Sequence, residues 1–246
     1  MAKDQRRAPR SKRPRSSPVP QGIEFGVRRE QRLKTTEKLK SGRTPLEVIE
    51  VAEYAAELTD RSIQSAVSQS PPNHALACRE GCAWCCYKLV GTTAPEVFRI
   101  AQYLQEHLSA EEFELRRDRI IGRDEVRKSL SADRWSAARL PCSLLVNDRC
   151  SAYPVRPLTC RGFNSSDARA CERWVKTRGH VEVPTYEPQH RLATFVLDGI
   201  RAGLAECKLP DELLELTAAL RIALTLTNAL DRWLGGESIF APAKMR

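Results

Sequence analysis

The sequence predicts a predominantly α-helical protein arranged around a cysteine-rich site, and three observations support this fold class. Apolar residues recur at the helical period over most of the chain after residue 44. Helix-start signals precede several of these stretches. The one pattern typical of strands is a short hairpin-like segment at residues 142–153. The chain has 246 residues, 41% of them hydrophobic, so we predict one sizeable domain over residues 44–240.

The first helices are predicted from their start signals. Residues 44–47 begin a helix that runs to about residue 69, because Thr44 is a capping residue, Pro45 fits the first helical position and two prolines follow at 71 and 72. Residues 93–96 start a second helix in the same way. Residues 109–112 form a capping box that opens a third, whose alternating charges indicate a solvated face.

Three later helices are predicted from apolar spacing. Residues 167–176 form a short helix, and residues 190–207 carry an apolar residue at every fourth position. A last long helix is predicted from Pro210 to Leu234, closed by two glycines. Its apolar residues cover more than one side, so it packs centrally or against a second copy. Its polar and charged residues argue against a membrane span.

The N-terminal segment, residues 1–43, differs from the rest of the chain in charge. It has 14 Lys and Arg against 4 acidic residues, a net charge of +10, whereas the remaining residues have 26 basic and 27 acidic side chains. It also has four prolines before residue 21 and little apolar periodicity, so we predict a largely disordered basic tail. Such an arm is either a solvated extension or a binding arm for nucleic acid, although no nucleic-acid-binding motif accompanies it.

Eight of the nine cysteines lie close together in the sequence. They are Cys78, Cys82, Cys85, Cys86, Cys142, Cys150, Cys160 and Cys171. A disulfide framework needs an oxidising compartment, and the basic residues 1–15 are followed by no apolar run of the kind that a secretory signal contains. We therefore expect a cytoplasmic protein with reduced thiols, in which dense cysteines indicate metal or redox chemistry.

The spacing of the first four cysteines favours a metal site. Cys82-x-x-Cys85 is the spacing by which one turn offers two thiolates to an ion in zinc and iron–sulfur proteins. In a helix all four cysteines would share one face, whereas Gly81 makes a mixed turn equally possible. The side chains of adjacent Cys85 and Cys86 diverge, so two ions or one bridged cluster would use both. The eight thiolates form either two sets of four or one multinuclear site.

The second cysteine block predicts a β-hairpin. Two short strands flank Asn147 and Asp148, which tolerate the positive φ angles of a tight turn. This hairpin would bring Cys142 and Cys150 to neighbouring levels. Two prolines then stiffen the connection to Cys160, which suits a site that holds its ligands in place before the ion arrives.

The cysteine pattern as a whole is similar to that of a known family. Its blocks are Cys78-x3-Cys82-x2-Cys85-Cys86, then Pro141-Cys142-Ser-Leu-Leu, then Cys150-Ser-Ala-Tyr153-Pro-Val-Arg156-Pro157-x2-Cys160-Arg161-Gly-Phe163. Over roughly residues 78–171 the chain resembles the YkgJ-type cysteine-cluster family, described as zinc- or iron-chelating domains. The resemblance implies metal binding, and it makes Arg156 and Arg161 candidates for donating hydrogen bonds to the thiolate sulfurs. Flagellin lysine methylases carry a related cysteine block, but no segment here is assignable to methyl-donor binding.

The first cluster is also similar to the Cys-x3-Cys-x2-Cys motif of radical SAM enzymes, in which three thiolates hold a four-iron cluster. That motif follows the first strand of a β/α barrel, with alternating strands and helices downstream. Here the downstream sequence is mostly helical and contains four further cysteines. The radical SAM hypothesis is therefore the less favoured one.

Several residues outside the motif are predicted to have structural roles. Cys207 continues the apolar stripe of residues 190–207, so we expect a core thiol and not a ligand. His74, His180 and His190 are isolated histidines and weak ligand candidates. Arg149 is predicted to be a surface charge on the hairpin.

The sequence thus predicts a protein that binds zinc or iron, as single ions or as an iron–sulfur cluster, through eight thiolates. A second hypothesis is an enzyme whose cluster performs redox or radical chemistry. A third is an interaction protein whose basic arm binds nucleic acid while the metal stabilises the body. No paired carboxylates, nucleophile motif or phosphate-binding glycine loop specifies a reaction, so no catalytic residue is assigned.

Overall fold

Helices dominate the structure, which confirms the predicted fold class. The computed structural model describes residues 21–79, 81–177 and 181–245. Within these ranges the strands are short and form two antiparallel two-stranded sheets. The β/α barrel that a radical SAM enzyme would require is therefore absent from the described part of the chain.

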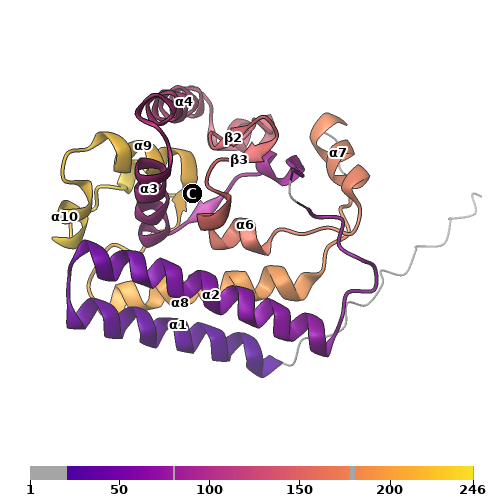
Figure 1. The fold of residues 1–246 in the computed structure, drawn as a ribbon, viewed down its shortest axis with the longest axis horizontal. Helices are drawn as coiled ribbons and strands as arrows, with labels where there is room; N and C mark the ends of the chain where they lie inside the picture. Colours follow the sequence, from indigo (N-terminus) through magenta and orange to yellow (C-terminus); the bar gives the residue numbers. More distant parts are fainter. Residues whose placement is uncertain (1–20, 80, 178–180, 246) are drawn as a thin grey trace, which may run out of the picture.

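Three long helices lie side by side and form one layer of the molecule (Figure 1). They are α1 (Gln21–Ser41), α2 (Pro45–Gln69) and α8 (Glu187–Glu206). All the other elements pack above this layer. Because α1 and α2 are consecutive and α8 comes much later in the chain, the layer brings an early and a late segment of the sequence into contact.

The remaining elements divide into two groups above the layer (Figure 1). In chain order they are η1 (Trp84–Tyr87), β1 (Gly91–Thr92), α3 (Ala94–His107), α4 (Ala110–Lys128), α5 (Ala132–Ala138), β2 (Leu145–Val146), β3 (Arg149–Cys150), η2 (Tyr153–Val155), α6 (Leu158–Gly162), α7 (Ala168–Thr177), β4 (Leu214–Glu215), α9 (Leu216–Thr225), α10 (Ala229–Leu234) and η3 (Ala241–Ala243). Helices α3, α4, α9 and α10 form one group, and the cysteine-bearing segments form the other. The pairing of β1 with β4, in which Gly91 lies opposite Glu215, connects the two groups.

The predicted helix starts are confirmed. Helices α2, α3 and α4 each begin with a capping box, in which a Thr or Ser side chain and a glutamate three residues later satisfy free backbone N–H groups. Helix α2 ends at Gln69, as the two following prolines predict. The capping interactions are local, which explains why they are visible in the sequence.

Helix α1 corrects the expectation of a largely disordered tail over residues 1–43. From Gln21 to Ser41 the chain is helical and packs against α8 and α2. Residues 1–20 lie outside the described residues. The folded body therefore begins well before residue 44, where the sequence analysis placed its boundary.

The buried face of α1 explains why its packing was not predicted. It is formed by Val27, Gln31, Thr35 and Leu39, which follow one another at four-residue spacing. Two of the four are polar, so the stripe lacks the apolar period that reveals most buried helices. Gln31 donates to the Thr35 hydroxyl at 3.1 Å, which gives its amide group a hydrogen bond inside the interface.

The long helix predicted from Pro210 to Leu234 is wrong. Residues 214–215 form β4, and the helical part is divided into α9 and α10. The break between these helices falls at Asn228, whose φ of 54° is left-handed. Glu215 caps α9 by accepting from the Thr217 and Ala218 N–H groups. Pairing of β4 with β1 across more than 120 residues decides this start, and no local sequence signal reports it.

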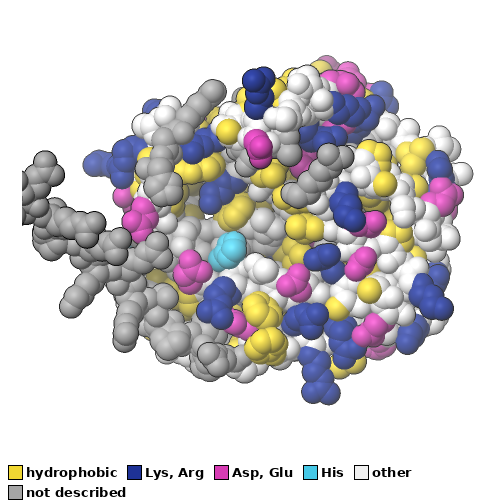
Figure 2. All heavy atoms as spheres, turned by 180° about the vertical axis from the view of Figure 1, so that it is seen from behind, with side chains coloured by type: hydrophobic (Ala, Val, Ile, Leu, Met, Phe, Trp, Pro, Cys, Tyr) yellow, Lys and Arg dark blue, Asp and Glu magenta, His cyan; other side chains and the backbone are white. Residues whose placement is uncertain are grey.

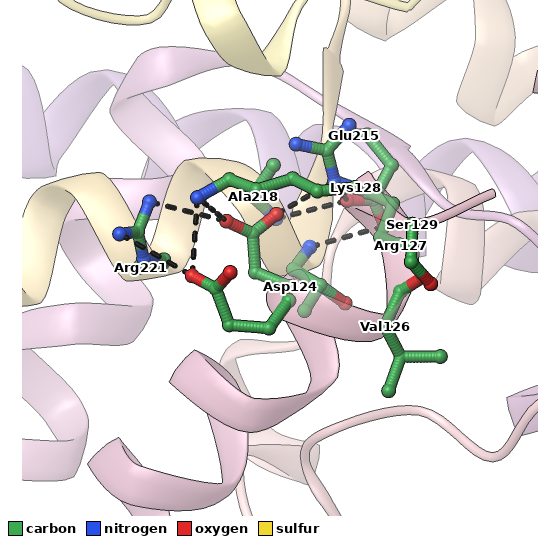
Figure 3. Close-up of polar contacts among 10 residues, drawn as sticks. Asp124, Val126, Arg127, Lys128, Ser129, Glu215, Ala218 and Arg221 are labelled. Atoms are coloured by element: carbon green, nitrogen blue, oxygen red, sulfur yellow. Dashed lines mark hydrogen bonds and ion pairs between the residues drawn. The ribbon is translucent and has the colours of Figure 1, made fainter. Parts of the chain in front are cut away.

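A buried carboxylate connects α4 to α9 and β4 (Figure 3). Asp124 is 1% exposed, and its oxygens lie 2.6 Å from Arg127 Nε, 3.4 Å from Lys128 Nζ and 3.3 Å from an Arg221 guanidinium nitrogen. Arg127 also lies 3.7 Å from a Glu215 carboxylate oxygen. This network fixes the helix that runs past the second cysteine block.

The face of the molecule opposite to that of Figure 1 shows Lys and Arg side chains interspersed with Asp and Glu (Figure 2). Many charges of the described residues are paired, for example Arg191 with Glu24 at 2.6 Å and Lys38 with Glu50 at 2.6 Å. This face therefore offers no continuous basic surface. Among the described helices, none combines the length and the apolar character needed to cross a membrane.

Candidate metal centre

The first four cysteines lie on a mixed turn and not on one helical face. Gly81 has a φ of +82°, a left-handed conformation that glycine adopts without steric cost. Cys82 donates its N–H to the Arg79 carbonyl at 3.1 Å and thereby closes the turn. Cys85 and Cys86 follow on the short 3₁₀ helix η1. The mixed turn that the sequence left open is the conformation observed.

The predicted hairpin is present, with shorter strands than expected. Asn147 and Asp148 have φ angles of 48° and 59°, as a two-residue turn requires. The register places Cys150 opposite Leu145, so Cys142 lies before the paired part of the hairpin. Cys142 donates its N–H to the Cys86 carbonyl at 2.7 Å. The second cysteine block is thus attached to the first through the backbone.

The segment that follows Phe163 and carries Cys171 is attached to the first block in a similar way. Ser165 donates its N–H to Cys78 Sγ at 3.3 Å and accepts from the Ala77 N–H at 2.8 Å. Helix α7, which carries Cys171, contacts η1. Hydrogen bonds within the chain therefore hold cysteines from distant parts of the sequence near one another.

Glu96 positions the short helix α6, which carries Cys160. Its side chain is 5% exposed and accepts the Thr93 N–H at 2.8 Å as the capping residue of α3. Its other oxygen accepts the Leu158 N–H at 2.7 Å, at the first residue of α6. One carboxylate therefore caps two helices, and both helix dipoles favour its negative charge. The sequence analysis assigned Glu96 only to α3, because Leu158 is 62 residues away.

All eight predicted ligands surround two adjoining hollows. Seven of them, all but Cys171, line a cavity of about 580 Å³. Four of them line a smaller hollow of about 30 Å³ together with Trp84, Lys88 and Trp174. These four are Cys78, Cys82, Cys85 and Cys171. The structure thus gathers the cysteines into one region from segments up to 93 residues apart.

The cysteines are close to one another without forming a ready-made coordination shell. No three His, Cys, Asp or Glu side chains in the described ranges are arranged to hold an ion as they stand. The donor set nevertheless fits zinc and iron chemically, because both ions bind soft thiolates and no hard oxygen ligand lies among the eight. The thiols are unpaired, so none is consumed by a disulfide.

One cysteine is predisposed to ionise. The Cys86 thiol donates a hydrogen bond to Cys85, which with the nearby charges of Lys88 and Arg156 lowers the pKa of Cys85 to about 7. Donation to Cys85 and burial raise the pKa of Cys86. Burial raises the pKa of Cys142 to about 12 and the pKa of Cys160 well above its ordinary value. A metal ion would have to displace protons from most of these thiols.

The two predicted arginines occupy different environments. The Arg156 guanidinium lies 4.1 Å from the centre of the Tyr153 ring. Its charge adds to the lowering of the pKa of Cys85 by the Cys86 hydrogen bond, and it opposes the burial that raises the pKa of Cys150. Arg161 is 8% exposed, donates to an Asp60 carboxylate oxygen at 2.6 Å and donates to the Pro154 carbonyl at 2.8 Å. Arg161 therefore connects α6 to α2, and the role of either arginine toward a sulfur remains a prediction.

Three further arginines near the site were not predicted. Arg116, Arg119 and Arg123 follow one another on α4 at spacings of three and four residues. Arg123 and Cys142 line the same small hollow, and the charges of Arg116 and Cys150 act on each other. The sequence analysis treated this helix as a solvated face. The spacing of these arginines, which places them on one side of the helix, was the signal in the sequence that could have revealed them.

The residues assigned to structural roles have different surroundings, and one of them, Arg149, lines the larger cavity. Cys207 is 3% exposed and belongs to the hydrophobic core, as predicted. His74 is exposed among prolines, and His190 is exposed and stacks on Phe163 at 6.4 Å. Arg149 is exposed on the hairpin, as expected. His180 lies outside the described residues.

A comparison with protein families identifies the class of this site. Residues 77–181 match the model of the family CxxCxxCC, whose description is "Putative zinc- or iron-chelating domain". This segment contains all eight clustered cysteines, so the resemblance predicted from the motif is confirmed. The match supports metal binding as the general property of the domain. Neither the curated proteins nor the solved structures contain a match to the chain.

Proposed function

We propose that this protein chelates zinc or iron through the thiolates of the eight clustered cysteines. The observation that carries the proposal is their convergence on two adjoining hollows within the segment that matches the metal-chelating family. Thiolates bind zinc and iron strongly and bind magnesium and calcium poorly. A metal site whose ligands come from separate segments of the chain, here four, is typical of an ion that stabilises the fold.

The two hollows favour a division of the cysteines into two sets. Cys171 lines only the smaller hollow, which it shares with three cysteines of the first block. The remaining four, Cys86, Cys142, Cys150 and Cys160, line the larger cavity and not the smaller hollow. The diverging side chains of Cys85 and Cys86 would then serve different sets. We infer two four-thiolate sites that meet at this pair.

An iron–sulfur cluster is the second candidate for the larger set. Its cavity of about 580 Å³ has room for a multinuclear centre as well as for a single ion. An iron–sulfur cluster is typically held by four cysteines. Four of the eight cysteines line the larger cavity without also lining the smaller hollow. Zinc and a cluster differ in colour and in inorganic sulfide, so a direct measurement separates them.

The test is to purify the protein without oxygen and to measure metals, sulfide and the visible spectrum. We expect bound zinc or iron in the wild type, and loss of metal in Cys82→Ser and Cys160→Ser, which belong to different sets. Cys207→Ser is the matched control, since this thiol lies in the core. A wild type that contains neither metal, or a Cys207→Ser variant that loses it, would contradict the ligand set. Loss of only part of the metal in each variant would support two sites.

A further inference from the structure

The larger cavity is lined by several positively charged side chains. Its volume of about 580 Å³ lies within the range of about 300–1,000 Å³ typical of small-molecule sites. Its charged lining residues, apart from the cysteines, are Arg79, Arg149, Arg156, Arg161 and Asp148. Among the described residues, four arginines and one aspartate thus line a cavity whose other lining residues are mostly cysteines, apolar side chains and amides.

Three of these arginines lack a partner among the described residues. The guanidinium groups of Arg79, Arg149 and Arg156 make no ion pair and donate no hydrogen bond to any described residue. Arg156 is held by its contact with the Tyr153 ring at 4.1 Å, which leaves its N–H donors available. Arginine is the side chain best suited to carboxylate and phosphate, because its planar fork donates two parallel hydrogen bonds.

Arg161 adds a buried donor to the same lining. It is 8% exposed, and two of its nitrogens are bonded to Asp60 and to the Pro154 carbonyl. Its Nε is buried and has no hydrogen-bond partner in the described structure. A buried N–H without a partner is costly and marks a place where a group from outside the chain is expected.

Other cations are available to offset the charge of the metal centre. Four thiolates outweigh one divalent ion, so each metal site carries a net negative charge. Lys88 lines the smaller hollow, and Arg123 lines a hollow with Cys142. Arg116 and Arg119 continue the same face of α4, and neither has an ion-pair partner in the described ranges. The arginines of the larger cavity therefore add to the positive charge that Lys88 and these three arginines of α4 already supply.

We propose that the larger cavity binds a small organic molecule bearing a carboxylate or phosphate group, held by Arg149 and Arg156 beside the metal. Tyr153, which lines the cavity next to these arginines, is placed to contact an apolar part of the molecule. The inference deepens the proposed function, since the same cavity is lined by seven of the cysteines. It assigns to the domain a ligand-binding role in addition to metal chelation.

The experiment uses the full chain, with the metal content of each sample measured. Inorganic phosphate and succinate are titrated separately by calorimetry at constant ionic strength, which distinguishes the two kinds of anion. We expect at least one of them to bind. Arg156→Gln should weaken binding at least about tenfold, because a charged hydrogen bond is lost, while Arg156→Lys should recover part of it. Arg169→Gln, an exposed arginine of α7 outside the cavity, is the matched control and should bind as the wild type does.

Specific outcomes overturn the proposal. Absence of binding of both anions to the wild type, or equal binding by Arg156→Gln and Arg169→Gln, rejects the cavity as an anion site. Competition by a short oligonucleotide, with loss of binding in an Arg116→Gln variant only, assigns the arginines to nucleic acid instead. Arg149→Gln, at the exposed hairpin, gives the same answer if Arg156→Gln does not fold. A wild type without metal contradicts the proposed function, and anion binding by that sample still decides the present inference.

Discussion

Replacement of Gly203 by alanine tests the packing of α1, the helix that the sequence did not predict. A β-carbon on Gly203 would lie 2.5 Å from Thr35 Cβ and 2.9 Å from the Arg32 carbonyl oxygen. Neither atom is the flexible end of a side chain. Helices α1 and α8 would have to separate locally, so the substitution overpacks their interface.

The expected magnitude follows from two opposing effects. Overpacking of a well-packed interface costs about 1–3 kcal/mol. Alanine is favoured over glycine inside a helix by about 1 kcal/mol, which offsets part of this cost. The net loss is up to about 2 kcal/mol in the free energy of unfolding. For a chain of this size the melting temperature should fall by up to roughly 8 °C.

Gly122→Ala is the matched control. Gly122 lies within α4, and a β-carbon there would meet no atom within 4 Å. The same change of residue should therefore raise the free energy of unfolding by about 0.5–1 kcal/mol. Urea unfolding followed by circular dichroism measures both variants. If Gly203→Ala were stabilised to the same extent as Gly122→Ala, α1 would not pack on α8 as described.

Three further predictions test other parts of the structure. Glu96→Gln should lower the free energy of unfolding by about 1–2 kcal/mol at pH 7, measured in urea. The glutamine amide N–H would point at one of the two backbone N–H groups, of Thr93 and Leu158, from which Glu96 accepts. Burial raises the pKa of Glu96 above its ordinary 4.5. The carboxyl therefore favours the folded state when protonated, and wild-type stability should fall as the pH rises from 4.5 through that pKa. An equal pH dependence in Glu96→Gln would contradict this account. Asp124→Asn should cost about 2–3 kcal/mol in the same assay, because three cations lose their buried carboxylate partner and keep only a partner elsewhere. The exposed control Asp118→Asn should stay within about 0.5 kcal/mol. Cys207→Ser should retain the full metal content in plasma mass spectrometry. In the wild type with its metal removed, the buried Cys207 thiol should react with iodoacetamide more slowly than Cys85, since burial raises the pKa of Cys207 whereas a hydrogen bond from Cys86 lowers the pKa of Cys85 to about 7.

The candidate site is held together by hydrogen bonds within the chain, which serve as its anchors. Cys86 accepts the Cys142 N–H, Cys78 accepts the Ser165 N–H, and Glu96 holds the helix that carries Cys160. Each anchor joins a different cysteine block to the rest of the body. Hydrogen bonds within the chain thus hold the blocks side by side, which reduces the conformational entropy that metal coordination has to overcome.

The sequence by itself determined the features that depend on neighbouring residues. The capping boxes at Thr93 and Ser109 set the starts of α3 and α4, because the groups involved are three residues apart. Asn147 and Asp148 predicted the hairpin turn, because a positive φ angle is a local preference. The cysteine spacing identified the class of site, since coordination chemistry limits which residues bind soft metals.

Only the tertiary structure decided the features that depend on distant partners. Helix α1 packs through Gln31 and Thr35 against glycines of α8 more than 160 residues away, so its buried face shows no apolar period. Pairing with β1 fixed β4 and moved the start of α9 to Leu216. The partner of Arg161, the second role of Glu96 and the grouping of the cysteines also depend on long-range contacts. A local pattern records what a residue prefers, whereas the folded chain decides which distant group it meets.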